Sequence, residues 1–485
     1  MDMSGSQYRA RKSVAEIVAS GEAHEHRLDR TLGAFSITAL GVGAIIGAGI
    51  FVLTGTAAAT YAGPGVMLSF VLAGLACAFV GLCYAELASL IPVSGSTYTY
   101  TYATLGELMA WIIGWDLILE YAMGAAAVSV GWSSYLVSLL AHFGIHLPPA
   151  LTHAPGMVAL PDGSTIQALF NLPAALIVLV LTAMLVLGTR ESARMNNLMV
   201  VIKLTVVLAF VGFGAAYIHA DNWVPFVPEN TGRFGEFGVS GVLRGASVVF
   251  FAFIGFDAVS TAAQEARNPQ RDMPLGILGS LAVCTLLYVA VAAVLTGIVP
   301  YTQLNVADPI ARGVDAIGMP WLSMLTKFGA LAGLTTVVLV LLYGQSRIFF
   351  TISRDGLLPP LFSRVHARTG TPYLSQICIG VVVALLAGLF PIGLLGEMVS
   401  IGTLFAFILV CAAVLYLRSA EPHMPRPFRV PGAPLVPIVG IGFCVLLMFG
   451  LPLDTWLRLV IWLALGLAVY FLYGRHHSVH RKRSD

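Results

Sequence analysis

Long apolar runs separated by short polar segments dominate the sequence. About twelve of these runs approach the ~20 residues that an α-helix needs to cross the hydrocarbon core of a membrane. The pattern predicts an all-α polytopic membrane protein with about twelve transmembrane helices. The expected runs are 33–61, 64–90, 105–142, 167–188, 196–219, 240–266, 275–299, 320–352, 373–391, 394–417, 434–451 and 454–474.

Glycines and turn formers interrupt two of the runs. One interruption is 41–51 (GVGAIIGAGIF) and the other is 250–258 (FFAFIGFDA). A broken helix is tolerated in a membrane only where protein or a water-filled cavity surrounds it. Close packing of small residues would explain either segment alone equally well. Because the segments open the first and sixth runs, they predict two sets of five helices in an inverted repeat, with a substrate site near the membrane midplane.

This organisation divides the chain into five parts. A cytoplasmic N-terminal segment precedes the first five-helix repeat, and two further helices and a cytoplasmic tail follow the second repeat. The expected boundaries are 1–30, 31–219, 240–417, 434–474 and 475–485.

A lysine, Lys203, lies inside the apolar run that covers residues 198–216. A charge at the centre of a bilayer costs about 2.5 kcal/mol on the lowest scales. Lys203 lies close enough to the start of its run for partial snorkelling to explain it. The alternative is that Lys203 faces a polar interior and exchanges a proton as the protein works, because burial disfavours the charged form.

Composition and charge agree with a membrane protein. Of 485 residues 58% are hydrophobic and 10% are charged, against about 25% charged in soluble domains. All six cysteines fall in apolar runs and none forms a CxxC pair, so we expect neither disulfides nor a metal site. The N-terminal 30 residues contain no apolar signal-peptide core. Nothing in the pattern indicates binding to nucleic acid.

Arginine and lysine gather in alternate loops. One set of loops holds most of them, and the other set holds only Arg233, Arg312 and Arg458. By the positive-inside rule, the rich set is cytoplasmic. The sequence therefore predicts a multi-pass protein of the cytoplasmic (inner) membrane with both termini in the cytoplasm.

Five segments, taken in order, resemble the amino acid–polyamine–organocation superfamily, and within it the bacterial branch of the cationic amino acid transporter family. The resemblance covers about residues 30–475. It rests on GVGAIIGAGIFVLTG (41–55), GPGVMLSF (63–70), CYAELASLIPVSGSTYTY (83–100), FFAFIGFDAVSTAAQEARNPQRDMPLGI (250–277) and RIFFTISRDGLLP (347–359).

The resemblance implies that the two breaks bind the backbone of an amino acid. Free N–H groups at the start of a half-helix suit a carboxylate, and carbonyls released by the second break suit an ammonium. The positions that match are Ile46, Gly47, Ala48 and Gly49 in the first break, and Phe251, Ala252 and Ile254 in the second.

The resemblance also implies a role for Lys203. In proton-coupled members, a lysine on the fifth helix contacts the broken first helix, where sodium-coupled relatives hold a sodium ion. We therefore expect H⁺ as the coupling ion and no cofactor. Protonated and disengaged in the outward-facing protein, Lys203 would release its proton to the inside after substrate binds and the gates exchange.

Four acidic residues compete for a place in or near the site. Glu120 matches, by resemblance, an acidic position facing the substrate, and an interhelical hydrogen bond would also explain it. We expect Asp116 to be structural or to lie near the cytoplasmic interface. We expect Asp257 to cap the second break or act directly, and Glu86 to pair within the cytoplasmic gate. The apolar Leu341 and Leu342 are expected to line the side-chain pocket, with Leu342 as the contact.

An apolar pocket favours neutral, alanine-like substrates or broad selectivity. The leading hypothesis is a proton-coupled L-amino-acid symporter that works by alternating access. The alternative is an exchanger of amino acids or amines, including cationic ones. No HExxH or GxSxG pattern indicates an enzyme. The sequence leaves open whether membrane lipid such as sterol, or a small single-helix accessory subunit, binds the protein.

Overall fold

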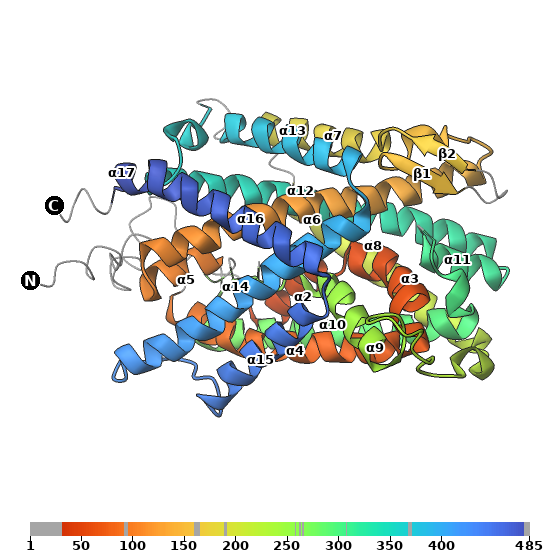
Figure 1. The fold of residues 1–485 in the computed structure, drawn as a ribbon, viewed down its shortest axis with the longest axis horizontal. Helices are drawn as coiled ribbons and strands as arrows, with labels where there is room; N and C mark the ends of the chain where they lie inside the picture. The colour runs from red at the N-terminus through yellow and green to blue at the C-terminus, as the bar shows by residue number, and fades with distance from the viewer. Residues whose placement is uncertain are drawn as a thin grey trace, which may run out of the picture.

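The computed structural model describes residues 32–91, 96–159, 165–188, 192–257, 259–260, 263, 266–306, 308–366 and 371–479. Within these residues the protein is almost wholly helical (Figure 1). Seven helices in the described part are long and apolar enough to cross a membrane, and five shorter apolar helices accompany them. The prediction of an all-α polytopic protein is confirmed. The expected N-terminal segment 1–30 lies outside the described residues, as does the tail beyond residue 479.

The first half of the chain contains five apolar segments, one of them built from several short helices. Its elements are α2 (Ala34–Ile45), η1 (Gly49–Leu53), α3 (Thr54–Ala57), η2 (Ala58–Ala62), α4 (Val66–Leu90), α5 (Ser96–Thr104), α6 (Glu107–His142), α7 (Leu172–Leu187) and α8 (Ser192–Gly214). The second half contains five more apolar segments and two further apolar helices. Its elements are α9 (Gly238–Val249), η7 (Phe250–Phe253), α10 (Pro269–Ile298), α11 (Pro309–Ala316), α12 (Pro320–Arg354), α13 (Tyr373–Leu389), α14 (Ile392–Ala420), α15 (Leu435–Phe449), α16 (Leu453–Val469), η11 (Tyr470–Gly474) and α17 (Arg475–His477).

Most helix limits agree with the apolar runs to within a few residues. The largest extension is in α10, which begins at Pro269, before the run expected at 275. Proline suits the first helical turn because it needs no amide donor there, and the Asp272 carboxylate accepts the N–H of Asn268. Polar residues in a first turn therefore hid the true start of this helix.

Several short elements outside the apolar runs were not predicted, α5 among them. A short antiparallel hairpin joins α6 to α7 and consists of β1 (Gly156–Ala159) and β2 (Thr165–Ala168). The eight-residue helix α11 lies between α10 and α12. Both elements are too short and too polar to give a transmembrane signal.

The helices form one bundle whose two ends differ (Figure 1). The helices α5 and α17 lie at the left of the view, and β1, β2 and α11 lie at the right. Inside the bundle, α6 packs on α12 and α14, while α10 packs on α2 and α4. The broken first segment thus lies against α10 through α2, and the broken sixth segment packs on α4 through α9 and η7.

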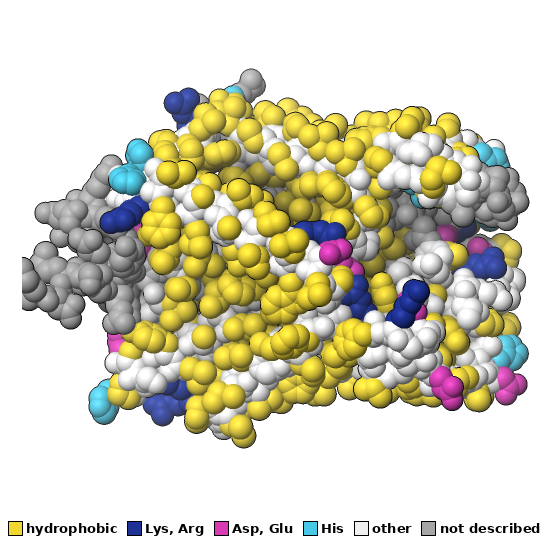
Figure 2. Space-filling view, viewed as in Figure 1, with side chains coloured by type: hydrophobic (Ala, Val, Ile, Leu, Met, Phe, Trp, Pro, Cys, Tyr) yellow, Lys and Arg dark blue, Asp and Glu magenta, His cyan; other side chains and the backbone are white. Residues whose placement is uncertain are grey.

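Hydrophobic side chains cover most of the face shown in Figure 2, and charged side chains lie toward its two ends and in one group right of the centre. Large apolar residues such as Phe35, Leu286 and Leu453 are more than 70% exposed on the described surface. An apolar belt between two polar ends is the surface that a bilayer requires. The boundaries of the two five-helix repeats stay a prediction.

Candidate functional site

The first segment is broken where its glycines are concentrated. The helix α2 ends at Ile45, and Ile46 has extended backbone angles (φ −70°, ψ 104°). A new helix starts at Ala48 and continues as the π-helical η1. The first N–H groups of a helix have no partner within it, so those of Ala48 and Gly49 are offered at the break. The predicted interruption is confirmed.

The sixth segment is broken in a different way. The helix α9 tightens into the 3₁₀ turn η7, and Ile254 is extended (φ −63°, ψ 138°). Gly255 follows with φ +107°, and a Cβ there would lie 2.9 Å from the carbonyl oxygen of Ala44. Only glycine fits this position, because it needs both a left-handed backbone and a close approach. The second predicted interruption is also confirmed.

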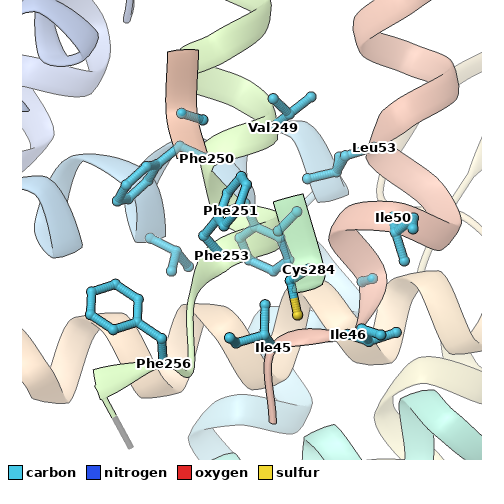
Figure 3. Packing of buried hydrophobic residues seen from close by; sticks show 14 of the residues in the cluster. Ile45, Ile46, Ile50, Leu53, Val249, Phe250, Phe251, Phe253, Phe256 and Cys284 are labelled. Carbon is cyan, nitrogen blue, oxygen red and sulfur yellow. The ribbon is translucent and has the colours of Figure 1, made fainter. Parts of the chain in front are cut away.

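The two breaks touch each other through their backbones. A Cβ at Gly49 would lie 2.2 Å from the Cα of Ala252. Figure 3 shows residues 45–53 and 249–256 facing one another, with apolar side chains packed around the contact. The Tyr288 hydroxyl lies 3.0 Å from the carbonyl oxygen of Ile45 and 2.7 Å from that of Ala252. Tyr288 therefore ties the end of α2 to η7.

These contacts correct one expectation about the second break. We expected the carbonyl oxygens of Phe251, Ala252 and Ile254 to be available for an ammonium. The carbonyl oxygen of Ala252 accepts from Tyr288, and that of Phe251 accepts the N–H of Ile254 at 3.3 Å. In a tight 3₁₀ turn, carbonyl oxygens accept hydrogen bonds from the N–H groups of the same turn. Fewer carbonyl oxygens are then available to a ligand than in an open break.

Lys203 reaches the first break from α8. Its Nζ donates to the carbonyl oxygens of Gly43 and Ile46, the latter at 2.9 Å, and its side chain is fully buried. The methylene stem lies against Gly333 of α12, where a Cβ would come within 3.2 Å of it. Snorkelling is wrong for this residue, because its amine points into the bundle. The contact with the broken first helix is the one that the resemblance implied.

A cavity of about 250 Å³ lies between the two breaks and the helices α6 and α12. It is lined by predicted residues from both breaks and by Glu120 and Asp257. The lining residues predicted from sequence are Gly47, Ala48, Gly49, Glu120, Phe251, Ile254 and Asp257. The rest of the wall is largely apolar and includes Val337, Val340 and Leu341 of α12. The volume suits a small molecule.

Three residues predicted to contact substrate lie behind the wall of this cavity. The side chains of Ile46 and Ala252 are buried in the contact between the breaks. Leu342 is buried among neighbouring helices, while Leu341 lines the cavity. Successive residues of a helix point about 100° apart, so a one-residue error in register moves a side chain from the cavity to the core. Leu341 therefore replaces Leu342 as the residue that lines the cavity from α12, while the backbone contact expected at Ile46 stays a prediction.

The acidic residues of α6 have different surroundings. Glu120 lines the cavity, and Asp257 and Asp116 lie close enough for their charges to interact with it. Asp116 is fully buried, and a Cβ at Gly402 of α14 would lie 3.0 Å from its Oδ1. Neither carboxylate oxygen of Asp116 has a hydrogen-bond partner among the described residues. The carboxyl group of Asp116 is therefore buried inside the bundle, where most polar groups have a hydrogen-bond partner, and does not lie at the protein surface.

Glu86 forms the centre of a charged cluster at the end of α4. Its Oε2 accepts from Arg418 Nη2 at 2.6 Å and from the N–H of Val430 at 2.7 Å. Arg426 Nε lies 3.4 Å from Glu86 Oε1. The cluster joins α4 to the end of α14 and to the loop before α15, as expected for a residue that holds one end of the bundle closed.

We predict that Glu86→Gln lowers the free energy of unfolding by about 3 kcal/mol, because it leaves two guanidinium groups without their buried counter-charge. Thermal unfolding in detergent, followed by size-exclusion chromatography, measures the effect. The matched control is Glu236→Gln, which removes an exposed pair with Arg233 and should cost about 0–1 kcal/mol. Equal melting temperatures for the two variants would contradict the role of the cluster.

Sequence reasoning missed Tyr288, Tyr121 and Thr336. Tyr121 and Thr336 line the cavity, and Tyr288 holds the breaks together. The single tyrosine inside the apolar run 275–299 was the available signal for Tyr288, because a buried hydroxyl needs a partner. The described residues contain no group of three or more histidine, cysteine, aspartate or glutamate side chains placed to hold a metal ion.

The fold and the site define a class of protein. A bundle of apolar helices with two broken segments and a buried cavity between them is the architecture of a membrane transporter. The chain belongs to the amino acid permease family, whose profile matches residues 32–470, and thus to the amino acid–polyamine–organocation superfamily.

Named relatives extend over nearly the whole chain. It is 51% identical over 477 residues to the branched-chain amino acid permease of Bacillus subtilis, covering 98% of this chain and 99% of that protein. It is 50% identical over 463 residues to the methylthioribose transporter of the same species, covering 96% and 97%. It is 39% identical over 522 residues to chloroplastic cationic amino acid transporter 9 of Arabidopsis thaliana, covering 93% and 89%. All three are named as transporters or permeases, and the protein is a transporter rather than an enzyme.

Proposed function

We propose that the protein imports L-amino acids by proton-coupled symport, with alternating access to the cavity between the breaks. The observation that carries the proposal is the position of Lys203. Its amine holds the carbonyl oxygens of Gly43 and Ile46, and Ala48 and Gly49, just beyond them, line the cavity. A proton gained or lost by this amine changes its hydrogen bonds to the first break, the same backbone segment that is proposed to bind the substrate.

The coupling follows from this shared backbone. A protonated amine carries a charge that must be compensated in a low-dielectric interior. The carbonyl oxygens at the end of α2 supply that compensation, in the way that they would surround a metal cation. In the proposed cycle, a substrate carboxylate binds the N–H groups of Ala48 and Gly49 after Lys203 has accepted an external proton. Release of the proton to the inside accompanies release of the substrate.

Selectivity is proposed to come from the apolar wall of the cavity. Backbone groups bind the carboxylate and ammonium that all amino acids share. The side chain of the substrate must therefore be recognised by other residues of the cavity. Val337 and Leu341 line the cavity from α12. Since neither carries a charge, the wall favours a small neutral side chain such as that of alanine, or broad selectivity. The relatives named for branched-chain amino acids and for methylthioribose match this chain almost equally well. The names of the relatives therefore do not identify the substrate of this protein.

We predict that Leu341→Ala shifts selectivity toward larger side chains, because it removes a branched side chain from the cavity wall. Leucine should then compete with labelled alanine at least ~10-fold better than in the wild type, which corresponds to about 1.4 kcal/mol. Competition in liposomes measures the change. The neighbouring Leu342→Ala should lower stability by about 2–5 kcal/mol and leave the order of competitors unchanged. A change of selectivity in Leu342→Ala alone would contradict the proposed wall.

A second candidate function is an exchanger for cationic amino acids. Glu120 and Asp257 line the cavity, and carboxylates suit a cationic side chain. Counterflow of labelled alanine into liposomes loaded with unlabelled alanine tests transport itself. Arginine as internal and external substrate tests the alternative. Absence of counterflow with every L-amino acid tried would refute both amino-acid proposals.

We propose that the protein lies in the cytoplasmic membrane with both termini in the cytoplasm. The last described helix, α17, lies at the same end of the bundle as α5 (Figure 1). The positively charged loops identified in the sequence are on the same side by the positive-inside rule. The opposite end, which carries β1, β2 and α11, then faces outward.

A further inference from the structure

The helix α11 covers the outward end of the first segment. It packs on η1, α3, α8 and α12. Its apolar face, formed by Ile310, Ala311 and Val314, is buried to within 1%. We refer to α11, packed against this half of the first segment, as the plug.

The plug fits its seat closely. A Cβ at Gly55 of α3 would lie 2.4 Å from both the carbonyl oxygen of Leu304 and the Cβ of Pro309. Beside it, the Tyr135 hydroxyl donates to the carbonyl oxygen of Phe51 at 2.7 Å. Little space remains for water along this contact.

A carboxylate lies at the hinge of the plug. Asp308 precedes the first residue of α11 and is only partly exposed. Its Oδ2 accepts a hydrogen bond from the Ser138 hydroxyl of α6. No hydrogen bond from the Asp308 side chain caps α11. The side chain therefore ties the hinge to α6 rather than to its own helix.

Few charged groups act on this carboxylate. Lys327 of α12 and Asp315 of α11 face it, and the two lie 3.9 Å apart. The charge of Asp308 also acts on the Tyr135 hydroxyl of α6. Burial raises the pKa of Asp308 above its ordinary value, while the Ser138 hydrogen bond and Lys327 oppose the shift.

We propose that Asp308 is a proton-binding site that links the pH of the external solution to closure of α11 over the substrate pathway. Lifting the plug hydrates the carboxylate, and closing the plug buries it. The closed form therefore binds the proton more tightly than the open form. By linkage, protonation favours closure by about tenfold for each unit by which closure raises the pKa.

The sign of the pH dependence follows from the raised pKa. The contribution of the proton to closure is complete below the ordinary pKa of aspartate, ~3.9. It is lost as the pH rises through the higher pKa of the closed form. External acid should close the plug, and external alkali should loosen it. The site is separate from Lys203 and needs no assumption about which substrate is carried.

Labelling of a buried cysteine tests the proposal without transport. Val314→Cys is placed on the buried face of α11 in a chain whose native cysteines are replaced by alanine. A membrane-impermeant maleimide labels it only when the plug lifts. Labelling rates are compared with and without Asp308→Asn at each pH. The pH dependence of thiol reactivity is the same in both proteins and cancels in the ratio of the two rates. Ala311→Cys is a second reporter in case the first does not fold.

The expected result is a difference in labelling rate between the reporters with Asp308 and with Asp308→Asn, which disappears at acidic pH. At alkaline pH the reporter with Asp308 labels several-fold faster than the reporter with Asp308→Asn, because asparagine imitates the neutral carboxyl. Toward pH ~4 the two rates converge, as protonation of Asp308 approaches completion. Asp221→Asn, which changes an exposed carboxylate outside α11, should give a pH-independent ratio. Val239→Cys, which replaces a side chain that is 86% exposed, verifies that this end faces the reagent.

A further variant fixes the direction of the effect. Ser138→Ala removes a hydrogen bond that favours the charged carboxylate, so it should move the midpoint of closure to higher pH. Equal labelling rates with and without Asp308→Asn at every pH would overturn the proposal. An unchanged or lower midpoint in Ser138→Ala would overturn it as well. Neither outcome bears on proton-coupled transport, because no substrate or gradient is used.

Discussion

Lys203→Gln is expected to abolish proton-driven accumulation of substrate while counterflow continues. Glutamine retains a group that can donate to the carbonyl oxygens of Gly43 and Ile46, which Lys203 now holds, but it carries no titratable charge. A 1:1 symporter with a gradient of one pH unit accumulates a neutral amino acid about tenfold. The variant should reach only the external concentration. Uptake of labelled alanine into liposomes with an inward proton gradient measures the difference.

Lys327→Gln is the matched control for that experiment. Lys327 is also buried in a transmembrane helix, but it lies 3.9 Å from Asp315 and away from the breaks. Its replacement should leave accumulation intact. Uphill, pH-driven uptake by Lys203→Gln would show that the lysine is a fixed structural cation, and proton coupling would have to be assigned to another group.

Gly49→Ala is expected to eliminate transport, because the two broken segments meet at this residue. The added methyl group would lie 2.2 Å from the Cα and 2.3 Å from the Cβ of Ala252. Backbone atoms cannot rotate away, so one segment must move. Overpacking of this kind costs typically about 1–3 kcal/mol. It also displaces the N–H groups proposed to bind the carboxylate, and we expect uptake to fall at least ~100-fold, equivalent to about 2.8 kcal/mol.

The same substitution at Gly212 controls for loss of a glycine from a transmembrane helix. Nothing lies within 4 Å of a Cβ at Gly212 in α8, and alanine is the better helix former by about 1 kcal/mol. Gly212→Ala should therefore transport at the wild-type rate. Wild-type uptake by Gly49→Ala, measured in the same liposomes, would mean that the close contact between the breaks is not required.

The sequence predicted those features that depend on composition and local pattern. Apolar runs of spanning length indicate transmembrane helices whatever their partners, and the helical segments were confirmed. Glycine clusters also indicate breaks locally, which is why 41–51 and 250–258 correctly located both interruptions. Lys203 was noticeable because a charge in an apolar run has few physical explanations.

The features that escaped prediction depend on contacts between distant segments. The Tyr288 hydroxyl reaches two carbonyl oxygens from α10, and nothing near Tyr288 in the sequence indicates either one. Leu341 and Leu342 are equally apolar, so only the rotation of α12 decides which of them lines the cavity. The plug α11 contains eight residues, too few for a reliable amphipathic pattern.

Alanine-induced proton entry is the most direct test of the account. The purified protein would be placed in sodium-free liposomes that contain a pH-sensitive dye, with the membrane potential clamped by potassium and valinomycin. We predict that external alanine acidifies the interior in the wild type, and that the protonophore-sensitive signal is absent from Lys203→Gln. Alanine entry that leaves the internal pH unchanged and requires amino acid inside the vesicles would contradict proton symport and identify an exchanger.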